Sequence, residues 1–430
     1  METHNALHHD TEDSLEFAAY IGIDWSDRKH DICLFDTQQQ TQEFCVIEHR
    51  PESIDTWVDS LRQRYGGRQI AICTEQKRGP LIYALCKYDF LVLYPVNPRT
   101  VAKYRQAFKP SRAKDDPTDA ALLMELLRKH RDHLQVWQPH SQQIRTLAQL
   151  VESRRTLVED KVRLTNRITA TLKHYFPQVL DWFEDKDTQV FCDFILQYPT
   201  LKAAQVAQTD ELTTFFHQHH VVRQTAISRR LAQIKQGVPL TEDASVIEPL
   251  TLLVKTWVQQ LKILLFSILT FDLEIEKLFS AHPDASLFAA LPGAGPHLAP
   301  RLLVAFGDDR DRYQSAQDLL RYAGIAPVQE KSGKKEWIHW RWSCPTFLRQ
   351  TFVEWANHSR NYSFWASEFY DDQRRKGKSH QVAIRSLAFK WIRILFRCWQ
   401  DRQPYDEVKY LLVLKRKGSP LVANLVAEGT

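Results

Sequence analysis

The sequence predicts an N-terminal α/β domain followed by a central coiled coil and a mainly helical C-terminal domain. Three observations support this fold class. Short apolar runs separated by turn residues fill the first part of the chain, an unbroken heptad repeat occupies the middle, and amphipathic helical patterns fill the remainder. The 430 residues correspond to about three domains of roughly 150 residues, each able to bury its own core.

The N-terminal part reads as strands and helices behind a polar tail at residues 1–15, which we expect to be disordered. The expected strands are 17–24, 30–36, 42–47, 69–73 and 90–95, and the expected helices are 51–65 and 80–87. Three strands joined by short turns, followed by alternating helices and strands, indicate a mixed sheet covered by helices. This order is that of a ribonuclease-H-like domain, which we place at residues 16–135.

The middle of the chain, residues 140–282, is expected to form a helical coiled coil that carries a mixed helical insert. Apolar residues three and four apart run through four heptads: Leu250, Val254, Trp257, Leu261, Leu264, Ile268, Phe271, Ile275 and Leu278. A weaker repeat at Leu150, Leu157 and Leu164 is interrupted by Arg154 and Lys161. The two helices could pair as an antiparallel hairpin within one chain or join two chains, and periodicity does not decide between these arrangements.

The third part, residues 285–417, begins with a hairpin-like segment and is followed by a tail at 418–430. The run Leu291-Pro292-Gly293-Ala294-Gly295-Pro296 precedes an apolar helix, as in a helix-hairpin-helix module. Gly293 and Gly295 would let backbone N–H groups approach phosphates closely.

Positive charge is concentrated near the C-terminus, although the net charge of the whole chain is only +5. Residues 331–417 contain 19 Lys and Arg against 8 Asp and Glu, together with seven of the twelve tryptophans. This mixture suits contacts to nucleic-acid phosphates and stacking on bases or sugars. A basic surface over a tryptophan-rich core would have the same composition.

Four carboxylates stand where a Mg²⁺-dependent nucleic-acid enzyme would need them. Asp24 closes the first expected strand and Glu75 follows the fourth, while Asp116 and Asp119 begin a helix, on which residues three apart share a face. Mg²⁺ prefers carboxylate oxygens. A pair of such ions can activate the attacking oxygen and neutralise the leaving oxygen of a phosphodiester. We therefore expect these four residues to hold Mg²⁺ and to be catalytic.

Each of these carboxylates also has a structural explanation. Asp116 and Asp119 suit the first turn of a helix, where acidic groups interact favourably with the helix dipole. Asp24 could open a turn, and Glu75 could pair with a neighbouring cation. Asp115 could also take the place assigned to Asp116.

Ser332 lies in a polar and basic segment, residues 329–335. An exposed hydroxyl beside a flexible Gly and three lysines could attack a phosphodiester, with the lysines stabilising the charge of the pentacoordinate phosphorus. A loop serine is also an ordinary surface residue, and the neighbouring sequence offers no obvious base.

The cysteines, the N-terminal sequence and the apolar runs indicate the cellular compartment of the protein. Seven scattered cysteines without a C-x-x-C pair argue against a disulfide framework and a structural zinc site. The N-terminus lacks the pattern of a signal peptide, and the longest apolar run, 263–271, is shorter than the roughly 18 residues of a membrane span. We expect a soluble, cytoplasmic protein.

At these residues the chain resembles the DEDD-type insertion-sequence transposases, a family that includes the pilin-gene invertase and the bridge-RNA-guided recombinases. In the first domain, the similar segments are Ile21-Gly22-Ile23-Asp24, Glu75, Asn97-Pro98 and Lys114-Asp115-Asp116-Pro117-Thr118-Asp119-Ala120. In the last domain, they are residues 291–296, Tyr322-Ala323-Gly324-Ile325-Ala326-Pro327, Ser332-Gly333, Phe347-Leu348-Arg349 and Arg375-Lys376-Gly377-Lys378.

The resemblance implies a RuvC-like domain whose DEDD carboxylates bind Mg²⁺, a coiled coil that joins protomers into a dimer or tetramer, and a C-terminal transposase domain. It implies that Ser332 forms a covalent phosphoserine link to DNA, beside metals held by its own or another protomer, and that strand exchange follows. It further implies an element-encoded structured guide RNA that chooses donor and target DNA, and a place at the nucleoid of a prokaryotic cell.

We expect nucleic-acid contacts from basic residues and glycines in these segments, namely Lys114, Gly293, Gly295, Lys331, Lys334, Lys335, Arg341, Arg349, Arg375, Lys376 and Lys378. Two departures from the family pattern lie near the site. Many relatives follow the Glu with Ala-Thr-Gly, where this chain has Gln76-Lys77-Arg78-Gly79, and many have a second Gly after Ser-Gly, where this chain has Lys334. The second departure could alter the loop around the serine.

Three other functions stay open. A RuvC-like Holliday-junction nuclease that uses metal-activated water would need the carboxylates but no serine. A sugar kinase of the actin-like fold also opens with Ile-Gly-Ile-Asp but continues with Gly-Thr, where this chain has Trp25-Ser26. A non-catalytic binding protein descended from a transposase would not need all four carboxylates.

Overall fold

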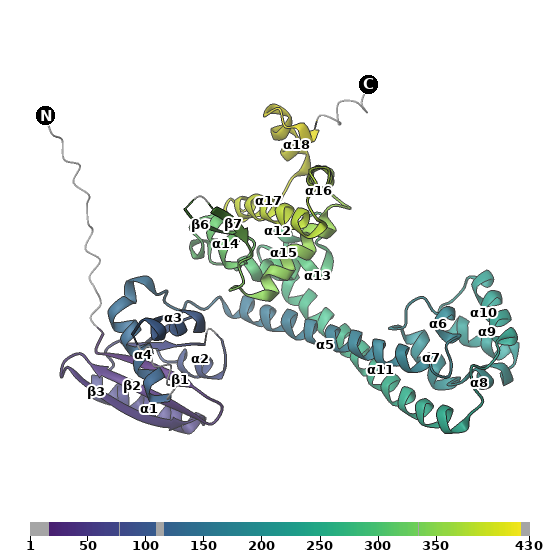
Figure 1. The fold of residues 1–430 in the computed structure, drawn as a ribbon, viewed down its shortest axis with the longest axis horizontal. Helices are drawn as coiled ribbons and strands as arrows, with labels where there is room; N and C mark the ends of the chain where they lie inside the picture. Colours follow the sequence, from purple (N-terminus) through teal and green to yellow (C-terminus); the bar gives the residue numbers. More distant parts are fainter. Residues whose placement is uncertain (1–16, 77, 109–115, 334, 423–430) are drawn as a thin grey trace. The chain divides into compact units, whose positions relative to one another are not determined.

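The computed structural model describes residues 17–76, 78–108, 116–333 and 335–422. The chain divides into two compact units, residues 1–139 and 140–430 (Figure 1). Each unit has its own hydrophobic clusters. The expected tail at 1–15 lies outside the described residues.

The first unit is a five-stranded mixed sheet with the strand order β3-β2-β1-β4-β5. Its elements are β1 (Ala19–Trp25), β2 (Lys29–Asp36), β3 (Thr41–Glu48), α1 (Pro51–Tyr65), β4 (Ile70–Thr74), α2 (Pro80–Leu85), β5 (Leu91–Pro95), α3 (Pro98–Phe108), α4 (Asp116–His130) and the short 3₁₀ turn η1 (Arg131–His133). The first three strands are antiparallel neighbours, whereas β4 and β5 run parallel to β1. The predicted α/β class is confirmed, and each expected strand lies within two residues of its predicted bounds.

The two faces of β1 have different roles. Ala19, Ile21 and Ile23 are fully buried and cluster with apolar residues of α1 and α2. Gly22 faces the other way, and a Cβ atom there would overlap the backbone of Ala120 and Met124 in α4. Because successive side chains of a strand alternate between faces, the missing side chain at Gly22 is what lets α4 lie directly on the sheet.

Helix α4 runs antiparallel to β1 across this face. Its C-terminal half packs near the start of β1: the leucines at 126 and 127 cluster with Phe17, and the Arg128 guanidinium lies 4.3 Å from the ring centroid of Phe35. Phe35 pairs with Tyr20 in the β1–β2 ladder. The N-terminal turn of α4 therefore lies at the opposite edge of the sheet, where β1 ends.

The second unit is built on an antiparallel pair of long helices, α5 (Gln142–Leu172) and α11 (Ala244–Ser280) (Figure 1). Gln143 donates a hydrogen bond to the carbonyl of Leu278, and Arg154 pairs with Asp272. The heptad residues therefore form a hairpin within one chain, which periodicity alone had left undecided.

The two cations that interrupt the weaker heptad repeat have partners outside their own helix. Arg154 Nη2 lies 3.1 Å from Asp272 Oδ2 on α11. Lys161 Nζ lies 2.5 Å from Asp187 Oδ2, two residues before α7 (Gln189–Gln197). Both interruptions are therefore ion pairs that tie α5 to its neighbours.

The insert between the two long helices forms a separate aromatic-rich cluster with their distal halves. Its helices are α6 (Val179–Trp182), α7 (Gln189–Gln197), α8 (Leu201–Val206), α9 (Thr209–Gln218) and α10 (Gln224–Gln236). Phe194 lies at its centre, in ring contact with Trp182, Phe183, Phe215 and Phe216. The predicted mixed helical insert is confirmed.

After α11 the chain is mainly helical, as predicted, with one two-stranded hairpin. The elements are α12 (Ala285–Ala289), α13 (Gly295–Phe306), η2 (Arg310–Arg312), α14 (Ala316–Tyr322), β6 (Val328–Ser332), β7 (Lys335–His339), α15 (Thr346–Ser359), α16 (Phe364–Arg375), α17 (His380–Gln400), α18 (Glu407–Arg416) and η3 (Pro420–Val422). Four tryptophans are fully buried in the core: Trp355, Trp365, Trp391 and Trp399. Core packing therefore explains more than half of the tryptophans noted between 331 and 417.

By length and composition alone, α11 could cross a membrane. Its apolar residues are divided between two faces in the structure. One face is the heptad seam, where Val254, Leu261, Ile268 and Ile275 are buried. The other face is exposed and carries Phe266 and Leu269.

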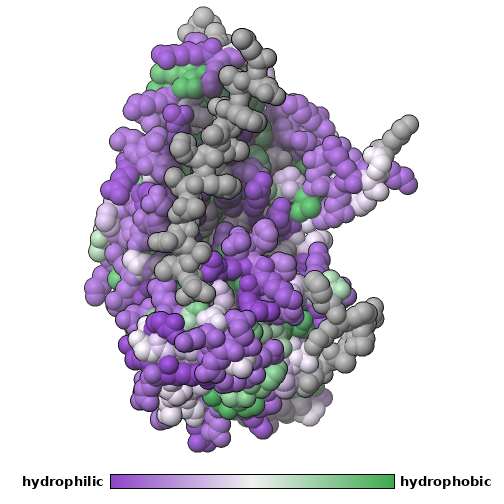
Figure 2. Space-filling view, turned by 90° about the vertical axis from the view of Figure 1, so that its left-hand side faces the viewer, coloured by the Kyte–Doolittle hydropathy of each residue, from purple (hydrophilic) through white to green (hydrophobic). Residues whose placement is uncertain are grey.

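Figure 2 shows a largely hydrophilic surface on the side that it draws, with apolar residues in small patches.

We predict that Gly22→Ala destabilises the first unit by about 1–3 kcal/mol, because the added methyl group must displace α4. Hydrogen–deuterium exchange of peptides from β1 and α4 measures this effect locally, and both peptides should exchange faster than in the wild type.

Gly66→Ala is the matched control, since Gly66 ends α1 with a φ of 62° and no atom lies within 4 Å of an added Cβ. Its cost should be about 1–2 kcal/mol, from the backbone conformation alone. Unchanged exchange in α4 of Gly22→Ala would contradict the close packing of α4 on β1.

Candidate active site and nucleic-acid surface

Two of the predicted carboxylates lie at the ends of neighbouring strands. Asp24 is the penultimate residue of β1, and Glu75 directly follows β4. In the parallel ladder Ile23 of β1 pairs with Thr74 of β4. Asp24 and Glu75 are the next residues after this pair, one on each side of the ladder. Neighbouring strands lie about 4.8 Å apart, which brings the two carboxylates to one edge of the sheet.

The same two carboxylates lie on the face that α4 covers. Asp24 shares the face of Gly22, and Glu75 shares the face of Cys73, because residues two apart in a strand point to the same side. Gly22 meets the α4 backbone, and Cys73 clusters with α4 leucines. The N-terminal turn of α4, with Asp119, lies at this edge as well.

Asp119 is a buried carboxylate with an arginine as its counterion. It is 3% exposed, and its Oδ1 lies 2.6 Å from Arg105 Nη2 on α3. The contact is close, although neither Asp119 Oδ1 nor Arg105 Nε has an aligned hydrogen bond in the described part of the chain. A buried carboxylate oxygen with unused acceptor capacity is suited to bind a cation.

The remaining member of the set is only partly described. The backbone of Asp116 begins α4, but its side chain lies outside the described residues, as do Lys114 and Asp115. Among the side chains that are described, no three His, Cys, Asp or Glu groups lie close enough to share a metal ion. The structure thus brings Asp24, Glu75 and the start of α4 to one edge without describing a complete ligand set.

A fifth carboxylate, Asp31, lies at the same edge and was missed by the sequence analysis. It pairs with Asp24 in the antiparallel β1–β2 ladder, which puts both side chains on the α4 face. Asp31 is 5% exposed and lies 3.1 Å from Lys29. The signal that could have revealed it is an acidic residue at a position where alternation in β2 predicts burial.

Ser332 is the last residue of β6 and is exposed on the β6–β7 hairpin. It pairs across the ladder with Lys335, and the neighbouring pair, Lys331 and Glu336, forms an ion pair of 3.3 Å. Lys334 lies outside the described residues. The hairpin therefore presents the hydroxyl to solvent beside cationic side chains.

The other end of the hairpin is held by a charged hydrogen bond. His339 Nε2 lies 2.7 Å from Glu330 Oε1, and this contact raises the pKa of His339 above its ordinary value. His339 pairs with Val328, four ladder positions from Ser332. It thus supports the hairpin rather than the hydroxyl.

Comparison with known proteins identifies the family. A transposase family model of the DEDD, IS110 type matches residues 21–177, and a model of the IS116/IS110/IS902 transposase family matches residues 285–371. The chain belongs to the IS110/IS116 family of transposases. The two matched segments contain the strand-end carboxylates and the serine hairpin respectively.

Two individual relatives match nearly the whole chain, and a third matches about one third of it. The protein assigned as the mini-circle transposase for IS117 of Streptomyces coelicolor is 28% identical, over 92% of this chain and 97% of its own length. The 44.8 kDa protein of insertion element IS116 of Streptomyces clavuligerus is 25% identical, over 89% and 95%. The pilin gene-inverting protein of Moraxella bovis is 31% identical, over 33% of this chain and 46% of its own length.

The glycine-rich turn of this transposase has a packing role at one of its two glycines. Gly293 adopts a φ of 72°, and an added Cβ would lie 3.0 Å from the backbone of His358. Trp355 Nε1 donates a hydrogen bond of 3.0 Å to the carbonyl of Pro292. Gly295 begins α13 beside open space. Gly295 is thus the position with room for an approaching phosphate.

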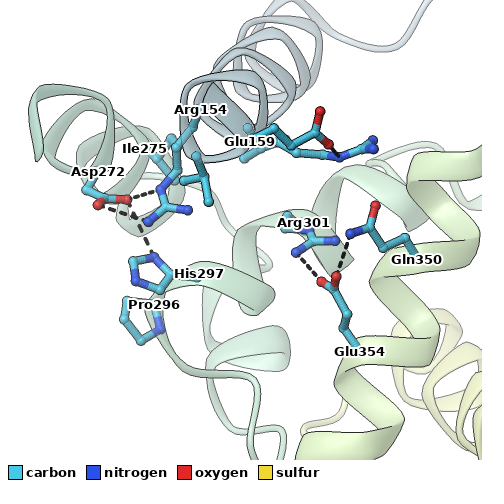
Figure 3. Close-up of a pocket in the computed structure, with 12 residues that line it drawn as sticks. Arg154, Glu159, Asp272, Ile275, Pro296, His297, Arg301, Gln350 and Glu354 are labelled. Carbon is cyan, nitrogen blue, oxygen red and sulfur yellow. Dashed lines mark hydrogen bonds and ion pairs between the residues drawn. The ribbon is translucent and has the colours of Figure 1, made fainter. Parts of the chain in front are cut away.

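A cavity of about 230 Å³ lies between α5, α11, α13 and α15 (Figure 3). Its charged lining residues are Arg154, Arg155, Glu159, Asp272, Arg301 and Glu354. Three ion pairs join these groups, so each arginine is matched by a carboxylate. We interpret this cavity as a polar joint between the long helices and the following helices of the transposase, because its charges are already balanced.

Three predicted contact residues lie at the end of α16. Arg375 lies 3.8 Å from Glu368, and Lys376 lies 2.7 Å from Asp372. Lys378 follows on the surface. These cations are exposed, and the first two are partly neutralised by acidic neighbours.

Proposed function

We propose that this transposase breaks and rejoins DNA at a Mg²⁺ site in its first unit and a serine on its β6–β7 hairpin. The proposed metal ligands are Asp24, Glu75, Asp116 and Asp119, and the proposed nucleophile is Ser332. The observation that carries the proposal is the meeting of two strand-end carboxylates with the N-terminus of α4 at one edge of the sheet. The buried, incompletely satisfied oxygen of Asp119 fits a cation ligand.

The serine step is a phosphoryl transfer. The Ser332 oxygen would bond to phosphorus while the bond to the departing sugar oxygen breaks, and the serine proton passes to that oxygen. Bound Mg²⁺ would supply positive charge that stabilises the departing oxygen. Attack by a sugar hydroxyl of the new strand would then release the serine, which completes strand exchange without loss of bond energy.

An element-encoded guide RNA is part of the proposal. Its support is the resemblance to bridge-RNA-guided recombinases and the excess of basic residues between 331 and 417. The basic side chains in this segment would bind the backbone phosphates of both RNA and DNA. The relatives come from bacteria, so we place the protein in the bacterial cytoplasm at the nucleoid.

We also propose that a second copy of the chain covers the exposed face of α11. The apolar residues of this face, each more than half exposed, are Leu252, Ile263, Phe266, Leu269 and Leu273. They lie on the side of α11 opposite to the seam with α5, since their spacing follows one helical face. An exposed apolar stripe of this kind marks an association surface, and a second α11 offers a surface of matching length and chemistry.

Ser332→Ala is expected to abolish a covalent protein–DNA adduct while leaving DNA binding intact. The measurement is denaturing gel electrophoresis of protein incubated with Mg²⁺, labelled element-junction DNA and RNA transcribed from the flanks of the element.

Ser343→Ala, at an exposed serine of the same region, is the matched control and should retain the adduct. Asp24→Asn should abolish both DNA cleavage and adduct formation, while the protein stays folded. Cleaved DNA without any adduct in the wild type would favour the alternative, a RuvC-like junction nuclease that uses metal-activated water.

Arg105→Gln is expected to make thermal stability depend on Mg²⁺. Loss of the arginine leaves the Asp119 carboxylate buried without a counterion, which costs on the order of 3 kcal/mol in the absence of metal. If Asp119 is a ligand, Mg²⁺ restores the balance and raises the melting temperature more than in the wild type.

The comparison is made by differential scanning calorimetry with EDTA or Mg²⁺. Arg62→Gln is the control, because Arg62 pairs with Asp89 on the surface. An equal Mg²⁺ response in Arg105→Gln and in the wild type would argue against Asp119 as a ligand.

Phe266→Glu is expected to weaken self-association at least tenfold, because it places a charge in the exposed stripe of α11. Sedimentation velocity over a concentration series measures the change. Val162→Glu, at a half-exposed position of α5, should leave association unchanged. A wild-type protein that stays monomeric, or floats with lipid vesicles, would contradict the assignment of a second copy to this face.

A further inference from the structure

Two arginines lie against Trp340 at the base of the β6–β7 hairpin, and a third follows it in the sequence. Arg385 of α17 lies over the indole ring, and the Arg349 guanidinium of α15 lies 5.6 Å from its centroid. Arg341 is the next residue along the chain. We call these three side chains and Trp340 the arginine cluster.

The arginine cluster has no acidic partner in the described part of the chain. None of its arginines forms an ion pair there, and Nε of both Arg341 and Arg385 is buried without a hydrogen bond. Burial and the neighbouring Arg349 lower the pKa of Arg385 to about 10. The cluster thus differs from the cavity in Figure 3, where each arginine is paired with a carboxylate.

Like charges held together and partly removed from water are unfavourable unless an anion joins them. Guanidinium groups bind phosphate through two parallel hydrogen bonds, and the indole ring keeps two of them in place. Buried donors without partners are then satisfied by phosphate oxygens. The arrangement is therefore complementary to a bound phosphate and incomplete without it.

The position of the cluster indicates which phosphate it takes. Trp340 directly follows β7, whose first residue, Lys335, pairs with Ser332. Five residues of extended strand span roughly 17 Å, so the cluster lies within about that distance of the serine hydroxyl. A duplex rises 3.4 Å per nucleotide on each strand, so about five nucleotides cover the same distance.

We propose that the arginine cluster binds a backbone phosphate of the DNA strand that is cleaved, about five nucleotides or fewer from the scissile bond. The phosphate contact stands by itself, whereas its placement relative to the scissile bond rests on the proposed function. The cluster would hold the strand in register while the hairpin presents Ser332.

Arg385→Gln is the diagnostic variant. DNA binding is measured by fluorescence anisotropy in EDTA over a range of salt concentrations, so that no cleavage enters the result. The plot of log K against log salt has a negative slope, and its magnitude should decrease by about 0.9, the value for one lost phosphate contact. The melting temperature of the free protein should stay equal or rise, because a buried, unpaired cation has been removed.

Arg397→Gln is the matched control on the same helix, since Arg397 is 86% exposed and pairs with Asp401. Its salt slope and melting temperature should match the wild type. Arg385→Lys keeps the charge but not the planar fork, so it should keep the salt slope and lose part of the affinity. Arg349→Gln repeats the test should Arg385→Gln fail to fold.

An unchanged salt slope together with a lower melting temperature would show that the cluster serves packing only, and would overturn the proposal. A slope that changes with RNA but not with DNA would overturn the assignment to DNA. A reduced DNA slope in a protein that never forms the Ser332 adduct would keep the phosphate contact and refute the proposed serine chemistry.

Discussion

The close packing of α4 on β1 is the constraint on which the candidate site depends. At Gly22 the sheet has no side chain, and the backbone of α4 occupies the space that a methyl group would need. This contact sets the height of the helix above the sheet. Its antiparallel course then brings the first turn, with Asp119, to the edge where β1 and β4 end in Asp24 and Glu75. A site shared by distant segments thus depends on one position that carries no functional group.

Charge is handled in two contrasting ways in this molecule. In the cavity between the long helices and α13, three arginines meet three carboxylates, and two of the resulting ion pairs join helices far apart in the sequence. In the arginine cluster at Trp340, the arginines meet no carboxylate in the described residues. The net charge of a region cannot separate these cases, because it counts charges without their partners. Only the second arrangement leaves interaction capacity for an external anion.

The sequence predicted the succession of strands along the chain and the strand ends well, since alternation, turn residues and apolar runs are local signals. It therefore placed Asp24 and Glu75 correctly at strand ends. It could not decide how the heptad helices pair, because the same seam suits a partner in the same chain or in another. Asp31 escaped notice because its place depends on register with β1, and Arg385 because its neighbours, Trp340 and Arg349, come from two other segments. Burial of four tryptophans likewise depends on tertiary packing.

The α5–α11 hairpin also has a consequence for how the chain folds. Arg154 and Asp272, which join the two helices, are 118 residues apart in sequence. A flexible loop of that length would cost conformational entropy to close and would slow the pairing of its ends. The intervening residues instead form a compact, aromatic-rich cluster with the distal halves of both helices. Once that cluster has formed, the remaining contacts between α5 and α11 can form one after another, starting beside the cluster. The insert would thus act as the folding nucleus of the helical hairpin.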